Sequence, residues 1–362
     1  MKTLLTTVLV ATLAVPALAG TLQKEINASP GETLTVDLRP GGSIEVRAWD
    51  KNSVSVEATV SGETGNIKVD RSDGGVAVSH RTGSGRNSQF KIQVPRRFDL
   101  DLETNGGSIT IENVDGTMKG ASRGGALRLS GLRGTLKLST HGGDITLRDS
   151  KVDGSVSTMG GNVLLENVDG TVKASSMGGN VSSRNTSTGA GGQSAVELST
   201  MGGNVIVEHA PNGATVSTMG GNVVVKNAGR AVRAKTMGGN VALTAIDGSL
   251  VASTMGGNVT ASIVATSPGS HDVTIESKGG DVEVVLPAGF AMNVEVEIAV
   301  TKPSARRYGI ESDFPLDVTT TPAAQADDSN ARRLIRGHGQ SGAGTHKVRI
   351  KTMNGDVKLK RG

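Results

Sequence analysis

Pairs of adjacent glycines recur at a fixed short interval through the middle of this 362-residue chain. The interval is longer between Gly178 and Gly202, where a short extra segment is added around Ser187–Gly192. The pairs begin at Gly106, Gly124, Gly142, Gly160, Gly178, Gly202, Gly220, Gly238 and Gly256, and Gly279-Gly280 closes the series. A short fixed period of this kind is typical of a solenoid, in which each repeat forms one coil and packs on its neighbours.

Inside each repeat, apolar and polar residues alternate with period two, which indicates strands rather than helices. After the glycines, one face carries Val163 and Leu165, and the corresponding residues of later repeats are Val205 and Val207, Val223 and Val225, and Val241 and Leu243. A second short strand follows the mid-repeat turn. Each repeat therefore predicts two strands and two glycine-rich turns, stacked about 4.8 Å from the next coil.

The predicted fold is all-β: a parallel β-solenoid (β-helix) of about ten 18-residue coils, on the order of 50 Å long. We expect a signal peptide over 1–19, a β-rich N-terminal cap over 20–103 and solenoid repeats over 104–286. Residues 287–362 should hold C-terminal strands, a mobile polar loop over 323–344 and a closing coil. The closing coil is indicated by "TMNGDV" (Thr352–Val357), which repeats the turn signature.

The N-terminus has the pattern of a secretory signal peptide. Lys2 precedes an apolar segment, Leu4–Val15, and Ala17-Leu18-Ala19 is an A-x-A cleavage site. The apolar segment is too short for a convincing membrane span. We therefore expect cleavage after Ala19 and export to the periplasm or the cell surface.

Composition excludes several classes of site. The chain has no cysteine, which excludes disulfides, thiol nucleophiles and Cys-zinc sites. A formal net charge of +4 is too small to predict nucleic-acid binding. No aromatic residue lies between Asp99 and Gly289, so small aliphatic side chains must fill a narrow core.

Three columns of equivalent residues support stacking in register. Charges of alternating sign succeed one another at Arg148, Glu166, Arg184, Glu208 and Lys226, which predicts a ladder of ion pairs rather than catalytic acids. A row of asparagines predicts a hydrogen-bonded ladder at Asn162, Asn180, Asn204, Asn222, Asn240 and Asn258. Inward hydroxyls that can bond turn backbone follow at Thr140, Thr158, Ser176, Thr200, Thr218, Thr236 and Thr254.

The chain resembles the bacterial putative-adhesin family of β-helical envelope proteins, long catalogued as a domain of unknown function. The resemblance is carried by "GGSIEVRAWDKNSVSVEATV" (Gly41–Val60), by the "GGNV" and "GGDI" coils and by "TMNGDVKLK" at the end. It implies an envelope or surface location and adhesion, and it supplies no catalytic residue.

Six methionines precede the glycine pairs and form the candidate binding site. They are Met159, Met177, Met201, Met219, Met237 and Met255. By parity they point outward, as do Arg123, His141 and Lys278 in the same column. Three interpretations remain: each methionine covers its glycine turn, the row is an apolar strip for a partner, or the thioethers bind Cu(I). The first is favoured, and no metal or cofactor is expected.

The function predicted is that of an exported, non-enzymatic binding or structural protein of the envelope. Its partner would be an unidentified envelope or surface component, protein or polysaccharide, with self-association through the methionines as a further option. A polysaccharide lyase or hydrolase is the alternative. It is disfavoured because Asp115, Asp153, Asp169 and Asp247 lie singly in turns and the six histidines are dispersed. Gly337, Gly339 and Gly342 match G-x-G-x-x-G, but in a segment predicted to be a polar loop.

Overall fold

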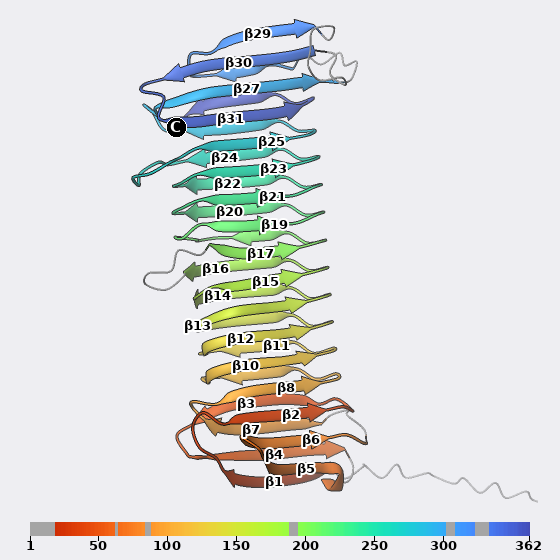
Figure 1. The fold of residues 1–362 in the computed structure, drawn as a ribbon. Helices are drawn as coiled ribbons and strands as arrows, with labels where there is room; N and C mark the ends of the chain where they lie inside the picture. The colour runs from red at the N-terminus through yellow and green to blue at the C-terminus, as the bar shows by residue number, and fades with distance from the viewer. Residues whose placement is uncertain (1–18, 62–63, 84–87, 188–194, 302–307, 323–332) are drawn as a thin grey trace, which may run out of the picture.

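The computed structural model describes residues 19–61, 64–83, 88–187, 195–301, 308–322 and 333–362. These residues form a rod of stacked coils (Figure 1). Its elements are the strands β1 to β32 and one short 3-10 helix, η1 (Thr64–Asn66). The predicted all-β parallel solenoid is confirmed. The signal peptide up to residue 18 and most of the inserted segment near 188–194 lie outside the described residues.

Each coil contributes one strand to each of two facing sheets. Sheet I consists of the strands that follow the glycine pairs and of β32 (Val357–Arg361), which follows Asn354-Gly355. The strands after the glycine pairs are β9 (Ile109–Glu112), β11 (Leu127–Ser130), β14 (Val163–Asp169), β16 (Val181–Ser187), β18 (Val205–Val207), β20 (Val223–Ala228), β22 (Val241–Ile246), β24 (Val259–Ile263) and β26 (Val282–Leu286). Sheet II consists of β8 (Asp99–Thr104), β10 (Asp115–Ser122), β12 (Arg133–Thr140), β15 (Val172–Ser176), β17 (Val196–Thr200), β19 (Ala214–Ser217), β21 (Val232–Lys235), β23 (Leu250–Thr254), β25 (Val273–Ser277) and β31 (His346–Met353). The long strand β13 (Ile145–Thr158) turns the corner and belongs to both sheets.

The coils stack in parallel and in register. In sheet I, Ile145 pairs with Val163 and Val163 pairs with Val181, so each coil is offset from the next by one sequence repeat. Val181 then pairs with Val205, so β16 and β18 keep the same register across the longer sequence interval. Identical positions therefore form straight columns along the rod, as the sequence period predicts.

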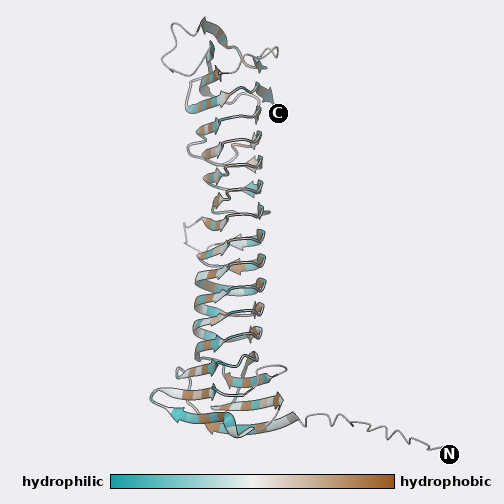
Figure 2. Cartoon of the chain, turned by 90° about the vertical axis from the view of Figure 1, so that its right-hand side faces the viewer, coloured by the Kyte–Doolittle hydropathy of each residue, from teal (hydrophilic) through white to brown (hydrophobic). Residues whose placement is uncertain are grey.

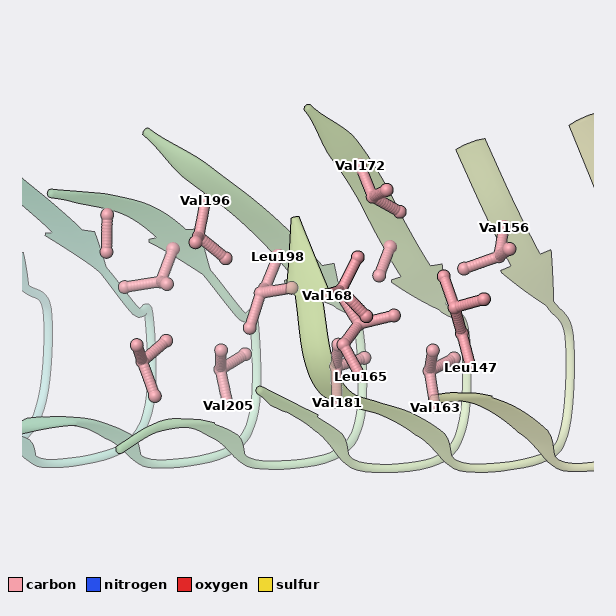
Figure 3. Packing of buried hydrophobic residues seen from close by; sticks show 14 of the residues in the cluster. Leu147, Val156, Val163, Leu165, Val168, Val172, Val181, Val196, Leu198 and Val205 are labelled. Carbon is pink, nitrogen blue, oxygen red and sulfur yellow. The ribbon is translucent and has the colours of Figure 1, made fainter. Parts of the chain in front are cut away.

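Small aliphatic side chains fill the space between the sheets. Val163, Leu165 and Leu147 come from sheet I and point toward Val156 and Val172 of sheet II (Figure 3). All are at most 2% exposed. The rod is narrow and its strands alternate between hydrophobic and hydrophilic residues (Figure 2). The predicted inward positions are confirmed, because strand pleating sends alternate side chains to opposite faces.

The N-terminal end carries two further coils and antiparallel strands. In sheet I, β3 (Ser43–Trp49) pairs parallel with β9, β7 (Gln89–Pro95) with β3, and then β4 (Ser53–Ser61) and β1 (Ala19–Asn27) are added antiparallel. In sheet II, β2 (Thr33–Leu38) follows β8, β6 (Gly75–His80) follows β2, and β5 (Ile67–Ser72) is antiparallel. Phe90 and Phe98 are fully buried in this wider base.

The closing coil is inserted beneath the C-terminal cap. β31 and β32 stack directly on β25 and β26, and β27 (Met292–Val300) and β28 (Ile310–Ser312) stack on them in turn. β30 (Arg333–Ser341) pairs antiparallel with β27, and β29 (Asp317–Pro322) forms the outer edge. In sequence order, the cap strands β27 to β30 thus come before β31 and β32, which make up the last coil.

The prediction of a mobile polar loop over 323–344 is wrong for its second half, where residues 333–341 form β30. The glycines in this strand accommodate the segment that crosses it. A Cβ on Gly339 would lie 2.3 Å from the carbonyl oxygen of Pro315, and one on Gly337 would lie 3.0 Å from the Ile310 side chain. The match to G-x-G-x-x-G thus falls largely on an antiparallel cap strand. Residues 323–332 lie outside the described part of the chain.

Among the described residues, no helix is long and apolar enough to cross a membrane.

Candidate functional site: a groove lined by methionines

A buried hydroxyl sets the geometry of each glycine turn. The Thr158 Oγ1 donates to the carbonyl oxygen of Gly143 in the preceding coil at 2.8 Å and accepts from the Gly161 N–H at 3.1 Å. The same pair of bonds recurs at Thr140, Ser176, Thr200, Thr218, Thr236 and Thr254. The predicted role of the inward hydroxyl row is confirmed.

The two glycines of each pair differ in how closely the next coil approaches. A Cβ on Gly161 would lie 2.1 Å from the carbonyl oxygen of Gly143, which leaves no room for a side chain. A Cβ on Gly160 would meet nothing nearer than 3.6 Å. The second glycine is therefore required by stacking, whereas the first is not.

The methionine row lies outside this turn, on the solvent side. Its six side chains are 40–54% exposed, whereas Met118 and Met292 in the core are fully buried. The outward orientation predicted from parity agrees with this exposure. Whether the row binds a partner remains a prediction.

Backbone hydrogen bonds hold the methionines in register. The Gly178 N–H donates to the Met159 carbonyl at 2.9 Å, and the Gly202 N–H donates to the Met177 carbonyl at the same distance. The bonds repeat from Gly220 to Met201 and from Gly238 to Met219. Consecutive methionines therefore start from stacked positions one strand spacing apart, about 4.8 Å.

Five of the six methionines line a groove of ≈ 710 Å³ at the edge of sheet II. Its lining consists of Ser139, Ser157, Ser175, Ser199, Ser217, Thr140, Thr158, Ser176, Thr200, Thr218, Met159, Met177, Met201, Met219, Met237, His141 and Lys235. Its lining includes no carboxylate, and its two ionisable side chains, His141 and Lys235, lie toward opposite ends. Sequence analysis found the methionines but not the groove, because the outward serines form its wall only once the coils stack.

The asparagine row forms a hydrogen-bonded ladder, as predicted. The Asn180 N–H donates to the Asn162 Oδ1 at 2.9 Å, and the Asn204 N–H donates to the Asn180 Oδ1 at 2.8 Å. Aspartates continue the ladder at both ends, through Asp144, Asp281 and Asp356. These side-chain oxygens satisfy backbone donors in the turns, so they serve the stacking of the coils.

The charge row pairs as predicted over part of its length. Arg148 lies 2.9 Å from Glu166, and Arg184 lies 3.5 Å from Glu208. On sheet II, Lys173 and Glu197 form a further pair at 2.8 Å. These exposed carboxylates have cationic partners on the adjacent coil, so they do not form the closely spaced acid pair of a glycosidase.

One cluster of polar residues was missed by sequence analysis. Asp247 Oδ1 lies 3.0 Å from His271 Nε2, and the rings of His271 and His346 meet at 5.3 Å between centroids. Phe290 stacks on His346 at 4.8 Å. The expectation that the histidines are dispersed is therefore wrong for this pair, which the closing coil brings together across 75 residues. The signal was the longer interval from Gly256 to Gly279, which marks an irregular turn.

This cluster has the residue types of a catalytic triad but not its connectivity. Ser267 Oγ donates to Asp247 Oδ2 at 2.6 Å rather than to a histidine, so no base activates it. Burial would raise the pKa of Asp247, but hydrogen bonds from Ser267, Thr266 and His271 outweigh it and hold that pKa well below its usual range. The cluster joins the turn that contains Asp247 to the closing coil, because His271 contacts both Asp247 and His346.

Among the described residues, no group of three or more His, Asp or Glu side chains could hold a metal ion.

Residues 25–360 match the family model described as Toastrack DUF4097. The chain belongs to this family. The resemblance to bacterial β-helical putative adhesins is thereby confirmed.

Solved structures similar to this Toastrack protein include two described as putative adhesins. One, from Parabacteroides distasonis, is 13% identical with a TM-score of 0.40 and covers 74% of this chain and 98% of its own. The other, from Parabacteroides merdae, is 14% identical with a TM-score of 0.38 and covers 73% and 95%. A putative lipid binding protein from P. distasonis is 15% identical with a TM-score of 0.34 and covers 73% and 96%. The comparison with proteins of curated function gives no match.

Proposed function

We propose that this Toastrack protein is an exported, non-enzymatic binding module of the bacterial envelope, and that the methionine groove is its binding site. The observation that carries the proposal is the row of half-exposed methionines in a groove of ≈ 710 Å³. A volume of this size is within the usual range of ligand sites, which are mainly apolar with a few polar groups. The buried core consists mainly of valine, leucine and isoleucine. A general abundance of methionine in the chain therefore does not explain the exposed row.

The chemistry of the groove supports binding rather than catalysis. Its serine and threonine hydroxyls have no carboxylate beside them in the groove, and the buried hydroxyl row is engaged with turn backbone. Hydrolysis or elimination in a polysaccharide needs acids and bases placed about the scissile bond. The alternative of a polysaccharide-acting enzyme therefore has no observation in its favour among the residues that line the groove.

The binding proposal is tested with two matched variants. Changing Met177, Met201, Met219 and Met237 together to Gln keeps side-chain length but removes apolar character, whereas changing all four to Leu keeps it. The measurement is the fraction of purified protein that sediments with envelope fragments, with a chelator present so that bound metal ions do not contribute. This fraction should fall at least tenfold for the Gln variant and stay near that of the wild type for the Leu variant. Equal sedimentation of the Gln variant, with an unchanged circular dichroism spectrum, contradicts the proposal and leaves the methionines as turn covers.

Export is tested by the mass of the protein isolated from its own cells. β1 begins at Ala19, and Gly20 pairs with Val60, so cleavage after Ala19 leaves this edge strand essentially whole. Mass spectrometry should show a chain that starts at Gly20. A chain that retains Met1 in the envelope fraction would contradict export by a cleaved signal peptide.

A further inference from the structure

We infer that the methionine groove binds a soft monovalent metal ion, Cu(I), through its thioether sulfurs. This inference rests on the proposed function, since it names the ligand of the same groove. The sequence alone favoured no metal. The structure adds two observations to the column of sulfur that the sequence already shows: the spacing of the column and the ligand set of the groove.

Sulfur, rather than apolar surface in general, distinguishes this column. Six of the ten methionines in the chain occupy it, and the other exposed large apolar residues described are the scattered Val251, Val264 and Val318. An apolar ligand would be held equally well by leucine or valine, which this chain uses throughout its core. Methionine differs from leucine mainly in flexibility and in its polarisable thioether, a ligand that selects Cu(I).

The stacking distance suits two thioethers on one ion. Metal–sulfur bonds are about 2.3 Å long in zinc sites, so two such bonds in line span about 4.6 Å. Coils stack about 4.8 Å apart, and hydrogen bonds fix adjacent methionine backbones in register. Two neighbouring side chains can therefore reach one ion without backbone movement. The five methionines of the groove provide two such pairs, and Met255, the next in the row, allows a third.

The rest of the groove argues against hard cations and for a soft one. Ca²⁺ and Mg²⁺ require several oxygen ligands, usually with carboxylates among them, and the groove lining has none. A soft monovalent ion can instead be bound by neutral thioethers and does not require carboxylate ligands. His141 precedes Met159 in the same column, and the Gly160 N–H donates to its carbonyl at 2.8 Å. Its imidazole, a ligand that copper also accepts, lines the groove at that end.

A second copy of the chain fits the row less well. The strip is about 24 Å long and one side chain wide, on the order of 10 Å, so it would bury about 240 Å² on each partner. A stable interface needs about 800 Å² on each partner. The area that the methionines alone could bury is therefore too small for a stable dimer.

The test uses Ag(I) as a redox-inert probe of thioether binding to the purified mature protein. Calorimetric titration and native mass spectrometry should give two to three Ag(I) per chain. The variant with Met177, Met201, Met219 and Met237 changed to Leu should retain at most one and bind at least tenfold more weakly, with the same melting temperature. A control with the core residues Met118 and Met292 changed to Leu should bind like wild type.

A second measurement uses Cu(I) prepared anaerobically. X-ray absorption should show sulfur at about 2.3 Å from copper, and excess Ca²⁺ should not displace the ion. No stoichiometric Ag(I) binding to wild type, equal binding by the Leu variant, or a copper shell without sulfur would each overturn the inference. Envelope binding by the Leu variant in chelator is measured separately, so the proposed function can stand when the metal inference fails.

Discussion

At the scale of single residues, the repeated "STMGGNV" (Ser157–Val163) assigns a different task to almost every position. Thr158 joins two coils through its hydroxyl, and Gly161 lets them approach. Asn162 satisfies the backbone of the next turn, and Val163 fills the core. The side chain of Met159 is exposed and makes none of these stacking contacts. For this reason we assign the binding function to Met159 and its equivalents.

The two glycines of a pair should respond differently to alanine. Gly161→Ala places a Cβ 2.1 Å from a backbone oxygen, so the coils must separate, and we expect the free energy of unfolding to fall by about 3 kcal/mol. In Gly160→Ala the new Cβ meets nothing nearer than 3.6 Å, so this variant should change the free energy of unfolding by less than about 1 kcal/mol. Urea denaturation of both variants measures the difference. Equal losses would mean that stacking does not set the need for the second glycine.

Core and surface positions one residue apart should also differ. Val225 is fully buried, so Val225→Asp buries an unpaired charge and should cost several kcal/mol, on the order of 4. Lys226 lies in the exposed charge row, and Lys226→Asp should cost under about 1 kcal/mol. Thermal unfolding compares them. Similar melting temperatures would refute the assigned strand faces.

At the scale of elements, the connection between the last regular coil and the closing coil depends on Asp247. Its carboxylate accepts hydrogen bonds from both the backbone and side chain of Thr266 and Ser267, and His271 lies against it. Since β31 and β32 support β27 and β28, a loosened turn here would weaken the whole C-terminal cap.

The depressed pKa of Asp247 predicts a loss of stability in acid. A carboxylate whose pKa is lower in the folded chain stabilises it fully above the unfolded value, about 3.9. That contribution is lost progressively as the pH falls below this value, toward the folded pKa. Asp247→Asn should therefore lower the melting temperature at pH 7 and flatten its decline between about pH 5 and pH 3.

The matched control for this acid effect is Asp101→Asn on the exposed side of β8. This variant should follow the wild-type profile at every pH. If Asp247→Asn also follows the wild-type profile, then the hydrogen bonds around Asp247 do not contribute to the acid sensitivity of the cap.

At the scale of the whole molecule, a stack of parallel coils needs an end, because an open coil offers unpaired backbone to another chain. Both ends use the same solution: antiparallel strands complete the stack, with β1 and β5 at one end and β29 at the other. The edge strands carry features that oppose further pairing, Lys24 on β1 and Pro322 on β29.

Removing the C-terminal cap should therefore cause association. Deletion of residues 290–344 joins β26 to β31 by a short turn and leaves the β31 edge open. We expect the rod to fold and to form concentration-dependent oligomers in sedimentation velocity, whereas the full mature chain keeps a constant sedimentation coefficient. A deletion variant that folds and remains monomeric at all concentrations would show that the cap does not protect the edge.

The sequence by itself determined the solenoid, because one short fixed period repeats every constraint of a coil in the next coil. Parity assigned Val225 to the core and Met219 to the surface, and identical columns predicted the asparagine and hydroxyl ladders. Tertiary structure decided what sequence-distant segments build together. Only stacking turned the outward serines and methionines into a groove, and only the return of β31 beneath β27 brought His346 to His271. No local period records the contact of His346 with His271, since these two residues share no repeat.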